Sequence, residues 1–207
     1  MPTHARLGFT VPDLDEEAAS EAIDILDDRL VALIDLALTL KHVHWNVVGP
    51  LFIGVHEMLD PQHEAVEDMI DKTAERIALL GGVPVGTPGA LVKRRSWDDY
   101  DLGRATVPEH LGALEVVYRG LITGHREAQA RLADLDPISE DLVIEHLRQL
   151  EPFQWFVRAH LESAGGQLSV RSDREREAAH EAAEGAERAG RDGAEHAASG
   201  VRETVRS

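Results

Sequence analysis

The sequence predicts an all-α protein built as a four-helix bundle, with one long crossover between the second and third helices. Two observations support this fold class. Apolar residues recur at alternating spacings of three and four in four long segments, which is the pattern of helices that bury one face. Glycine and proline pairs separate these segments, and a stretch rich in both residues, up to about residue 106, joins the second segment to the third.

The first predicted helix is the most strongly patterned part of the chain. We expect residues 1–13 to form an irregular arm, after which Asp13 or Asp15 caps the helix and acidic residues occupy its first turn. The seam of this helix comprises Ile23, Leu26, Leu30, Leu33, Ala37, Leu40, His44 and Val47. Gly49-Pro50 ends the helix, because proline lacks the backbone donor that a further turn needs.

The second helix is predicted from about Phe52 to Leu80, and Gly81-Gly82 stops it. Its core stripe comprises Val55, Leu59, Val66, Ile70, Thr73 and Ile77. The crossover that follows contains one short patterned piece, Ser96-Trp97-Asp98-Asp99-Tyr100-Asp101, between glycine-rich and proline-rich stretches.

Two more helices complete the predicted bundle. Pro108 suits the first position of the third helix, whose seam comprises Leu111, Leu114, Tyr118, Leu121, His125, Ala128, Leu132 and Leu135. We interpret His125 as structural, because no carboxylate accompanies it. Asp136-Pro137 separates a fourth helix, from about Ser139 to Ser163, with apolar residues Leu147, Leu150, Phe153, Phe156, Val157 and Leu161. Ferritin-like folds have this arrangement of four helices and a crossover.

Composition separates a bundle at residues 14–168 from a low-complexity tail at residues 169–207, which is too poor in large apolar residues to build a core. The 207 residues include no cysteine, which excludes disulfides and thiolate metal sites. The first residues lack the apolar stretch of a signal peptide, and no apolar run is long enough to span a membrane. We therefore expect a cytoplasmic protein, and association with the nucleoid stays open.

The second helix carries a stripe of candidate metal ligands beside its core stripe. Asp60, Asp71 and Glu75 lie at about 40°, 60° and 100° around the helix from His56, so all four share one face. Imidazole nitrogen and carboxylate oxygen suit iron, zinc or manganese. Asp60 and Asp71 are about 16 Å apart along the axis, which is too far for one metal ion. A second, antiparallel copy across a twofold axis would bring Asp71 and Glu75 opposite His56 and Asp60, giving two sites per dimer. The alternative is a solvated acidic face.

Four other polar residues of these two helices were weighed as ligands. His44 replaces a leucine on the first seam, either as a ligand or as a hydrogen-bonded core histidine. His42 points to nearly the opposite face, so we exclude it. His63 and Glu67 lie near the middle of the stripe, where they act as extra ligands or as solvated side chains.

An iron pair held within one subunit is not expected. Ferritin bundles of that kind carry Glu-x-x-His motifs on their inner faces. The one such motif in this sequence is Glu177 to His180, in the low-complexity tail. This result agrees with a site shared between two chains.

The ligand motifs resemble the signature of the Dps family, the mini-ferritins named as DNA-binding proteins from starved cells. The resemblance rests on His44-Trp45-Asn46, Gly49, the stretch from Phe52 to Asp60, and Asp71-Lys72-Thr73-Ala74-Glu75-Arg76. Phe153-Gln154-Trp155-Phe156 adds to it, and the whole match covers about residues 20–168. Residues 150–168 resemble the actinobacterial members most.

This resemblance implies a hollow homododecamer with ferroxidase sites at its twofold interfaces. Fe(II) would be oxidised there, preferably by hydrogen peroxide, and the Fe(III) mineral kept inside, which protects the cell and its DNA from oxidative damage. One subunit would supply His44, His56 and Asp60, and its partner Asp71 and Glu75. The same ligands also suit zinc, so a structural or zinc-loaded site is an alternative.

Two further assignments depend on the same resemblance. Trp45, beside a ligand, would either intercept stray oxidising equivalents or simply pack. Asp141 and Glu145, four residues apart at the start of the fourth helix, would line a threefold pore for iron. Alternatively, they are acids that favour a helix N-terminus.

The net charge of the chain is opposite in sign to the charge that a DNA-coating protein needs. The formal net charge is −17. From Ser172 onward six arginines face nine acidic residues, so the tail is acidic as well. Phosphate binding requires an excess of lysine and arginine. We therefore expect weak or absent DNA binding, and a DNA-condensing nucleoid protein with secondary metal binding is the alternative function.

Overall fold

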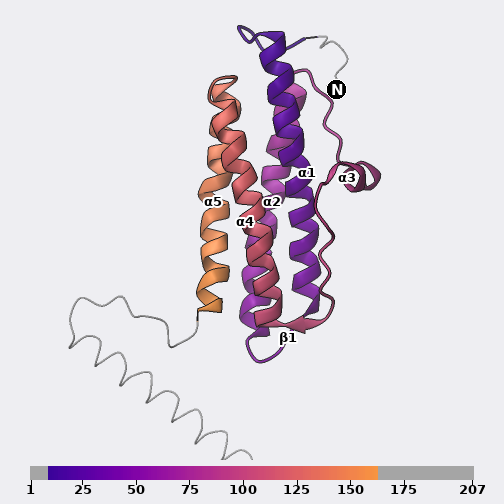
Figure 1. Cartoon of the computed structure of the whole chain (residues 1–207), viewed down its shortest axis with the longest axis vertical. Coiled ribbons are helices and arrows are strands. Elements are labelled where there is room, and N and C mark those ends of the chain that lie inside the picture. Colours follow the sequence, from indigo (N-terminus) through magenta and orange to yellow (C-terminus); the bar gives the residue numbers. More distant parts are fainter. Residues whose placement is uncertain (1–8, 163–207) are drawn as a thin grey trace, which may run out of the picture. The chain divides into compact units, whose positions relative to one another are not determined.

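The computed structural model describes residues 9–162, and the predicted tail and most of the predicted arm lie outside this range. Four long helices form two antiparallel pairs, α1 (Glu16–Asn46) with α2 (Phe52–Leu79), and α4 (Val107–Leu132) with α5 (Pro137–Leu161). The two pairs pack through α1 against α4 and α2 against α5 (Figure 1). This arrangement confirms the predicted four-helix bundle.

The start of α1 follows from its capping residue. The carboxylate of Asp15 accepts hydrogen bonds from the backbone N–H groups of Glu17 (2.8 Å) and Ala18 (3.3 Å), which are otherwise unpaired at a helix start. Asp13 instead lies in a turn with a φ of 63°. Of the two predicted caps, Asp15 is therefore the one that the structure uses.

The end of α1 is one residue earlier than the predicted seam, which includes Val47. The helix stops at Asn46, and β1 (Val47–Val48) pairs in parallel with β2 (Ala105–Thr106) at the end of the crossover. The seam pattern extended the helix through Val47 because its side chain is indeed buried. A β-branched residue packs equally well in an extended segment, so burial alone could not distinguish the two.

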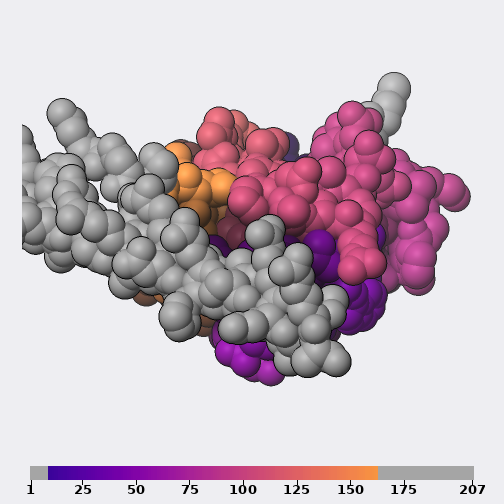
Figure 2. All heavy atoms as spheres, turned by 90° about the horizontal axis from the view of Figure 1, so that it is seen from below, coloured from indigo at the N-terminus to yellow at the C-terminus, as the bar shows by residue number. Residues whose placement is uncertain are grey.

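The short helix of the crossover lies before the patterned piece at residues 96–101. α3 (Pro88–Arg94) begins with proline at its first position, whereas residues 96–101 contain no helix. That patterned piece is held by side chains: the Trp97 Nε1–H donates to Asp35 on α1 at 2.8 Å, and Arg95 pairs with the same carboxylate at 3.1 Å. Figure 2 shows the crossover as a magenta lobe at one edge of the molecule.

The start of α4 is one residue earlier than predicted. Val107 is its first residue, so Pro108 occupies the second position of the helix. The Glu109 carboxylate accepts from the backbone N–H (2.8 Å) and the hydroxyl (2.6 Å) of Thr106, which fixes the helix start.

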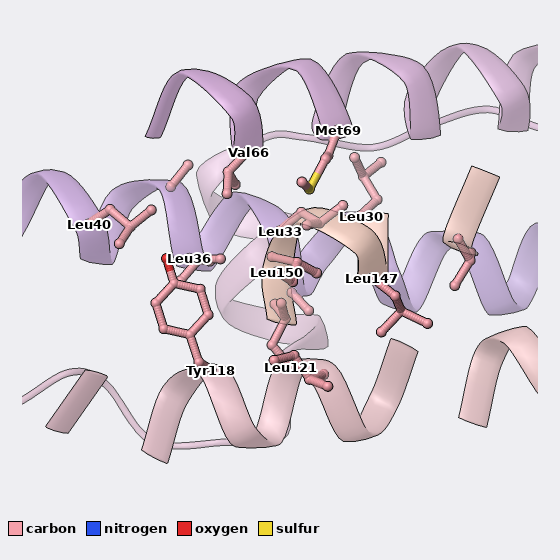
Figure 3. Close-up of a cluster of buried hydrophobic side chains, with 14 of the residues drawn as sticks. Leu30, Leu33, Leu36, Leu40, Val66, Met69, Tyr118, Leu121, Leu147 and Leu150 are labelled. Carbon is pink, nitrogen blue, oxygen red and sulfur yellow. The ribbon is translucent and has the colours of Figure 1, made fainter. Parts of the chain in front are cut away.

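The core is formed by the four seams, with two additions from α2. Gln62 and Met69 are fully buried, and the predicted Ile70 is only half-buried. The Gln62 amide oxygen accepts from the Tyr118 hydroxyl at 2.7 Å, which offsets part of the cost of burying this amide. Side chains of all four helices meet in Figure 3, namely Leu30, Leu33, Leu36, Leu40, Val66, Met69, Tyr118, Leu121, Leu147 and Leu150.

His125 lies inside this core, as its structural interpretation requires. It is fully buried, and its Nδ1–H donates to the Leu121 carbonyl one turn earlier, at 2.9 Å. A second buried histidine, His146 on α5, lies beside it with ring centroids 5.8 Å apart. None of the helices in residues 9–162 combines the length and apolarity that a membrane span requires.

Candidate metal centre

A tight turn brings the candidate ligands of α1 and α2 together. His44 lies in the last turn of α1, and His56 and Asp60 lie in the first turns of α2. Between the helices Gly49 adopts a φ of 109°, a conformation that glycine reaches without steric cost, and its carbonyl accepts from the Phe52 N–H at 3.1 Å. The chain thus reverses within a few residues and places His44 against His56.

The two histidines hold each other through reciprocal hydrogen bonds. Nδ1 of His44 lies 3.0 Å from the His56 carbonyl oxygen, and Nδ1 of His56 lies 2.9 Å from the His44 carbonyl oxygen. A carbonyl only accepts, so each Nδ1 carries the hydrogen and each Nε2 keeps its lone pair. Histidines that bind metals are oriented in this way, with one ring nitrogen donating to a carbonyl and the other facing the metal.

Asp60 completes the cluster on this side and is held as a carboxylate. Its Oδ1 accepts from the Lys41 ammonium at 2.8 Å and lies 3.3 Å from Nδ1 of His44. The hydrogen bond from Lys41 lowers the pKa of Asp60 more than burial raises it, and the positive charge of Lys41 adds to the lowering. An ionised carboxylate is the form that binds metal.

Asp71 and Glu75 lie further along α2 and are exposed. Asp71 is about 16 Å along the helix axis from Asp60, so these two carboxylates cannot join the cluster of their own chain. Within residues 9–162, no three His, Asp or Glu side chains of one chain are placed to hold a metal ion. One chain therefore presents two separate parts of a ligand set, one where the end of α1 meets the start of α2 and the other further along α2.

Exposed apolar side chains surround the first part of this set. Trp45, next to His44 in the sequence, is 73% exposed, and Leu51 and Ile53 at the start of α2 are exposed as well. The Phe52 ring approaches the His56 ring edge-on, with centroids 6.1 Å apart. Large apolar side chains grouped on a surface are typical of a region that another protein surface covers.

Comparison with known proteins places the chain in a family. The family model of the ferritin-like domain matches residues 23–164. A DNA protection during starvation protein from Mycolicibacterium smegmatis is 59% identical over 161 residues, covering 78% of this chain and 88% of that protein. The solved structure of Mycobacterium smegmatis Dps in its tetragonal form is 58% identical and superposes with a TM-score of 0.76, covering 79% of this chain and 100% of that one. The chain belongs to the Dps family of ferritin-like proteins.

A second solved Dps structure agrees with this result. DpsA14 from Streptomyces coelicolor is 61% identical, with a TM-score of 0.76, and covers 80% of this chain and 100% of its own. The family and the fold class that the sequence predicted are both confirmed. The relatives include the mycobacterial and streptomycete proteins that an actinobacterial resemblance implies.

The other polar residues weighed as ligands have separate partners in this Dps chain. Nε2 of His42 lies 2.7 Å from the Leu102 carbonyl oxygen in the crossover, away from the His44 cluster. His63 lies 3.7 Å from Glu67 one turn later, which forms a local pair on α2. The geometry thus gives neither position a place among His44, His56 and Asp60.

The two acids at the start of α5 differ from each other. Glu145 accepts from the Lys72 ammonium at 2.8 Å, and Lys72 also contacts Asp68 at 2.9 Å. The hydrogen bonds that Lys72 donates to Glu145 and then to Asp68 raise its pKa, so its ammonium is retained. Asp141 is exposed, with no ion pair to another residue of the described part. Within one chain, Asp141 is therefore the freer of the two carboxylates.

Lys41 is the residue of this centre that sequence reasoning missed. It lies three residues before His44, a spacing that places the two side chains on one face of α1. That spacing was the available signal. The contact itself depends on the turn that returns Asp60 to α1, and a pattern along one helix does not reveal it.

Proposed function

We propose that this Dps-family chain is the subunit of a ferroxidase and iron-storage cage. The substrates are Fe(II) and hydrogen peroxide, and the product is an Fe(III) mineral kept inside a shell of twelve copies. By consuming both substrates together, the cage protects the cell and its DNA from oxidative damage. Its place of action is the cytoplasm.

The observation that carries this proposal is the divided ligand set on α1 and α2. His44, His56 and Asp60 are oriented on one chain, while Asp71 and Glu75 face outward without partners in residues 9–162. In the proposed dimer each site joins the first group of one chain to the second group of the other. The exposed apolar side chains around Trp45 support burial of this region by a partner.

The chemistry of the donors fits two iron ions as substrate. Carboxylates bind Fe(II) and hold Fe(III) more strongly, and they can bridge two metal ions. The Nε2 lone pairs of His44 and His56 add neutral ligands, which limits the negative charge at the site. Zinc suits the same donors and would compete with iron.

Pairing two iron ions determines how the peroxide is reduced. Two Fe(II) ions give one electron each to one hydrogen peroxide molecule, and its O–O bond breaks to yield two oxygen atoms at the oxidation level of water. A single Fe(II) ion would supply one electron only, and the peroxide would then release a hydroxyl radical. A site with two ions therefore oxidises iron without that radical.

Three residues have proposed roles outside the ligand set. Trp45, exposed next to His44, intercepts oxidising equivalents that leave the site. Asp141 and Glu145 lead Fe(II) towards the interior at the start of α5, and three copies would sum their charges. In this proposal iron passing Glu145 shares the carboxylate with Lys72.

The test is the rate of Fe(II) oxidation by peroxide in an Asp71→Ala/Glu75→Ala double variant. We expect fast oxidation to be lost while the assembled mass and helix content are retained, because both side chains are exposed and unpaired in the single chain. The control is Asp98→Ala/Asp101→Ala, which removes two exposed carboxylates from the crossover. Full turnover in the first double variant would exclude these ligands.

A further inference from the structure

A partly buried hydrogen bond joins a phenol of the crossover to an imidazole of α4. The Tyr100 hydroxyl lies 2.9 Å from Nδ1 of His110, in the first turn of α4, and 3.3 Å from its carbonyl oxygen. The two rings are almost parallel, 7° apart in orientation, with centroids at 6.0 Å. A short contact of this kind provides a direct path for a proton between the two side chains.

The imidazole is the base of this pair. His110 is fully buried, and burial lowers its pKa, opposed mainly by the backbone of Asn46. Burial also raises the pKa of Tyr100, so the phenol keeps its proton in the resting protein. In the neutral ring whose hydrogen is on Nε2, the protonated phenol donates and Nδ1 accepts.

The chain contains a second tyrosine whose partner differs. Only Tyr100 and Tyr118 occur in the sequence. Tyr118 is fully buried in the core, and its hydroxyl donates to the Gln62 amide oxygen at 2.7 Å. An amide oxygen accepts a hydrogen bond but does not take up the proton near neutral pH. Tyr118 is fully buried and Tyr100 half-buried, but only Tyr100 is hydrogen-bonded to a base.

The Tyr100–His110 pair packs against the end of α1 that carries the candidate metal ligand His44. The His42 ring meets the Tyr100 ring edge-on, with centroids 5.8 Å apart, and His42 precedes His44 by two residues. The backbone of Asn46, the last residue of α1, faces His110. The pair therefore packs against the last turns of α1, which also carry His44 and Trp45.

We propose that Tyr100 and His110 form a redox-active pair, in which Tyr100 gives up one electron while its phenolic proton passes to Nδ1 of His110. The oxidant is a strong one-electron acceptor such as the hydroxyl radical, which becomes hydroxide. The O–H bond of Tyr100 breaks, an N–H bond forms on His110, and a neutral tyrosyl radical remains. Fe(II) then returns one electron, the proton moves back to Tyr100, and the iron leaves as Fe(III).

This role depends on the proposed function for the source of the oxidant and for Fe(II) as reductant. The paired iron chemistry avoids the hydroxyl radical, but a site that holds a single Fe(II) ion produces it. A donor in the crossover that packs against the end of α1 removes that oxidant before it reaches other groups. Tyr118 lacks a base that accepts its proton, so it does not share this role.

The first test uses the assembled full chain without metal, so that it does not depend on ferroxidase activity. Azide radicals from pulse radiolysis supply the one-electron oxidant, and the tyrosyl radical is measured by its absorption and its electron paramagnetic resonance signal. We expect Tyr100→Phe to lose most of the signal and Tyr118→Phe to retain it. Absence of the radical in the unmodified protein, or its loss in Tyr118→Phe only, would overturn the assignment.

A His110→Leu variant separates proton acceptance from packing. Tyr100 is still present in it, so retention of the tyrosyl signal at the unmodified level would show that His110 is not the acceptor. Because His110 is buried, its circular dichroism and assembled mass are measured first. If this variant does not fold, the rate of radical formation in the unmodified protein is compared in H₂O and D₂O. Slower formation in D₂O would show that proton transfer accompanies the oxidation of Tyr100. The absence of such slowing would exclude coupled proton transfer.

The second test adds Fe(II) and peroxide and measures hydroxyl radical with a spin trap. We expect Tyr100→Phe to release more trapped radical for each iron oxidised than Tyr118→Phe does. Equal release by the two variants would overturn the protective role of the pair. If the metal-free radical forms on Tyr100 but the unmodified protein does not oxidise Fe(II), the proposed function fails and the redox pair stands.

Discussion

The imidazole rings of His44 and His56 stack with their centroids 3.6 Å apart and their planes 25° apart, while each ring bonds to the backbone carbonyl of the other residue. Neither ring can rotate without breaking its own hydrogen bond and the stacking of its neighbour. The two Nε2 atoms are therefore oriented before any metal arrives. Such orientation reduces the entropy that is lost on binding.

His44, His56 and Asp60 lie together on one chain, so a site that also needs Asp71 and Glu75 of a partner can be tested by mixing variant subunits. We expect shells reassembled from His56→Ala and Asp71→Ala subunits to regain part of the ferroxidase activity. In a mixed dimer one site keeps all its ligands, while the other site lacks both His56 and Asp71. The measurement is Fe(II) oxidation by peroxide at equal total protein.

The control for the mixing experiment is each variant dissociated and reassembled alone. Mass measurement must show that mixed shells have formed. Mixed shells that are no more active than either parent would contradict a site built from two chains, whereas activity above both parents has no explanation if each site lies within one chain.

Lys41 is expected to compete with metal for Asp60. Its ammonium donates to Oδ1 at 2.8 Å, so a metal ion must displace or share this contact. Lys41→Met keeps the length of the side chain and removes the charge. Because the pair is partly exposed, we expect the apparent affinity for a divalent ion to rise by only about two- to fivefold. Titration with Co²⁺, which is not readily oxidised, measures this change.

Lys93→Met is the matched control for this substitution. Lys93 is exposed in the last turn of α3, and its removal changes the net charge equally. If both variants bind Co²⁺ equally tightly, the effect comes from total charge and not from the contact with Asp60. Weaker binding by Lys41→Met would show instead that the ammonium helps to hold the carboxylate in place.

The features of the fold that follow the helical period could be predicted from the sequence. The seam of α1 and the stripe of α2 follow directly from the helical period, so the bundle and the positions of His56, Asp60, Asp71 and Glu75 on one face were predictable. The location of α3 was not. Residues 96–101 form no helix. They are held by a hydrogen bond from Trp97 to Asp35, a contact between distant parts of the chain that the local pattern does not reveal.

The cluster around His44 shows the same limit. Helical spacing placed His44 on a mostly buried seam, which by itself favoured a hydrogen-bonded core histidine. The geometry of the turn at Gly49 is what brings His56 against it and lets the two rings exchange hydrogen bonds with backbone carbonyls. The Lys41–Asp60 contact depends on the same turn, so both relationships became visible only in three dimensions.

The buried histidines of the core predict sensitivity to acid. Burial lowers the pKa of His125 to about 3 and of His146 to about 4, so both are neutral in the folded protein. In the unfolded chain they take up protons below about pH 6.5. Stability from these groups is therefore full above pH 6.5 and falls as the pH drops towards their folded values. Between pH 7 and pH 5 we expect a loss of about 2 kcal/mol for each histidine.

The measurement is chemical denaturation at pH 7 and pH 5, at one protein concentration because assembly adds to stability. His146→Leu should lose less stability than the unmodified protein over this range. His160→Leu is the control, since His160 is exposed on the same helix. An unchanged pH dependence in His146→Leu would show that other groups cause the acid sensitivity.

The last prediction is that this protein protects by iron chemistry and does not coat DNA. Each chain carries a net charge of −17, and a closed shell multiplies the repulsion of phosphate. The tail arginines Arg174, Arg176, Arg188 and Arg191 alternate with acids in the sequence, which reduces their local positive charge. DNA binding requires lysine and arginine to displace counterions, and neither extension has a large excess of them.

Gel retardation of plasmid DNA by the assembled shell tests this prediction. At about 0.15 M salt, where surface charges are screened beyond roughly 8 Å, and with a chelator present, we expect little retardation. The chelator matters because divalent cations can bridge acidic protein to phosphate, and added Mg²⁺ therefore serves as a separate arm. Tight binding in chelator that weakens with salt would show that the arginines act as a cluster despite the neighbouring acids. Retardation only with Mg²⁺ would assign DNA association to cation bridging and leave iron oxidation as the protective activity of the chain.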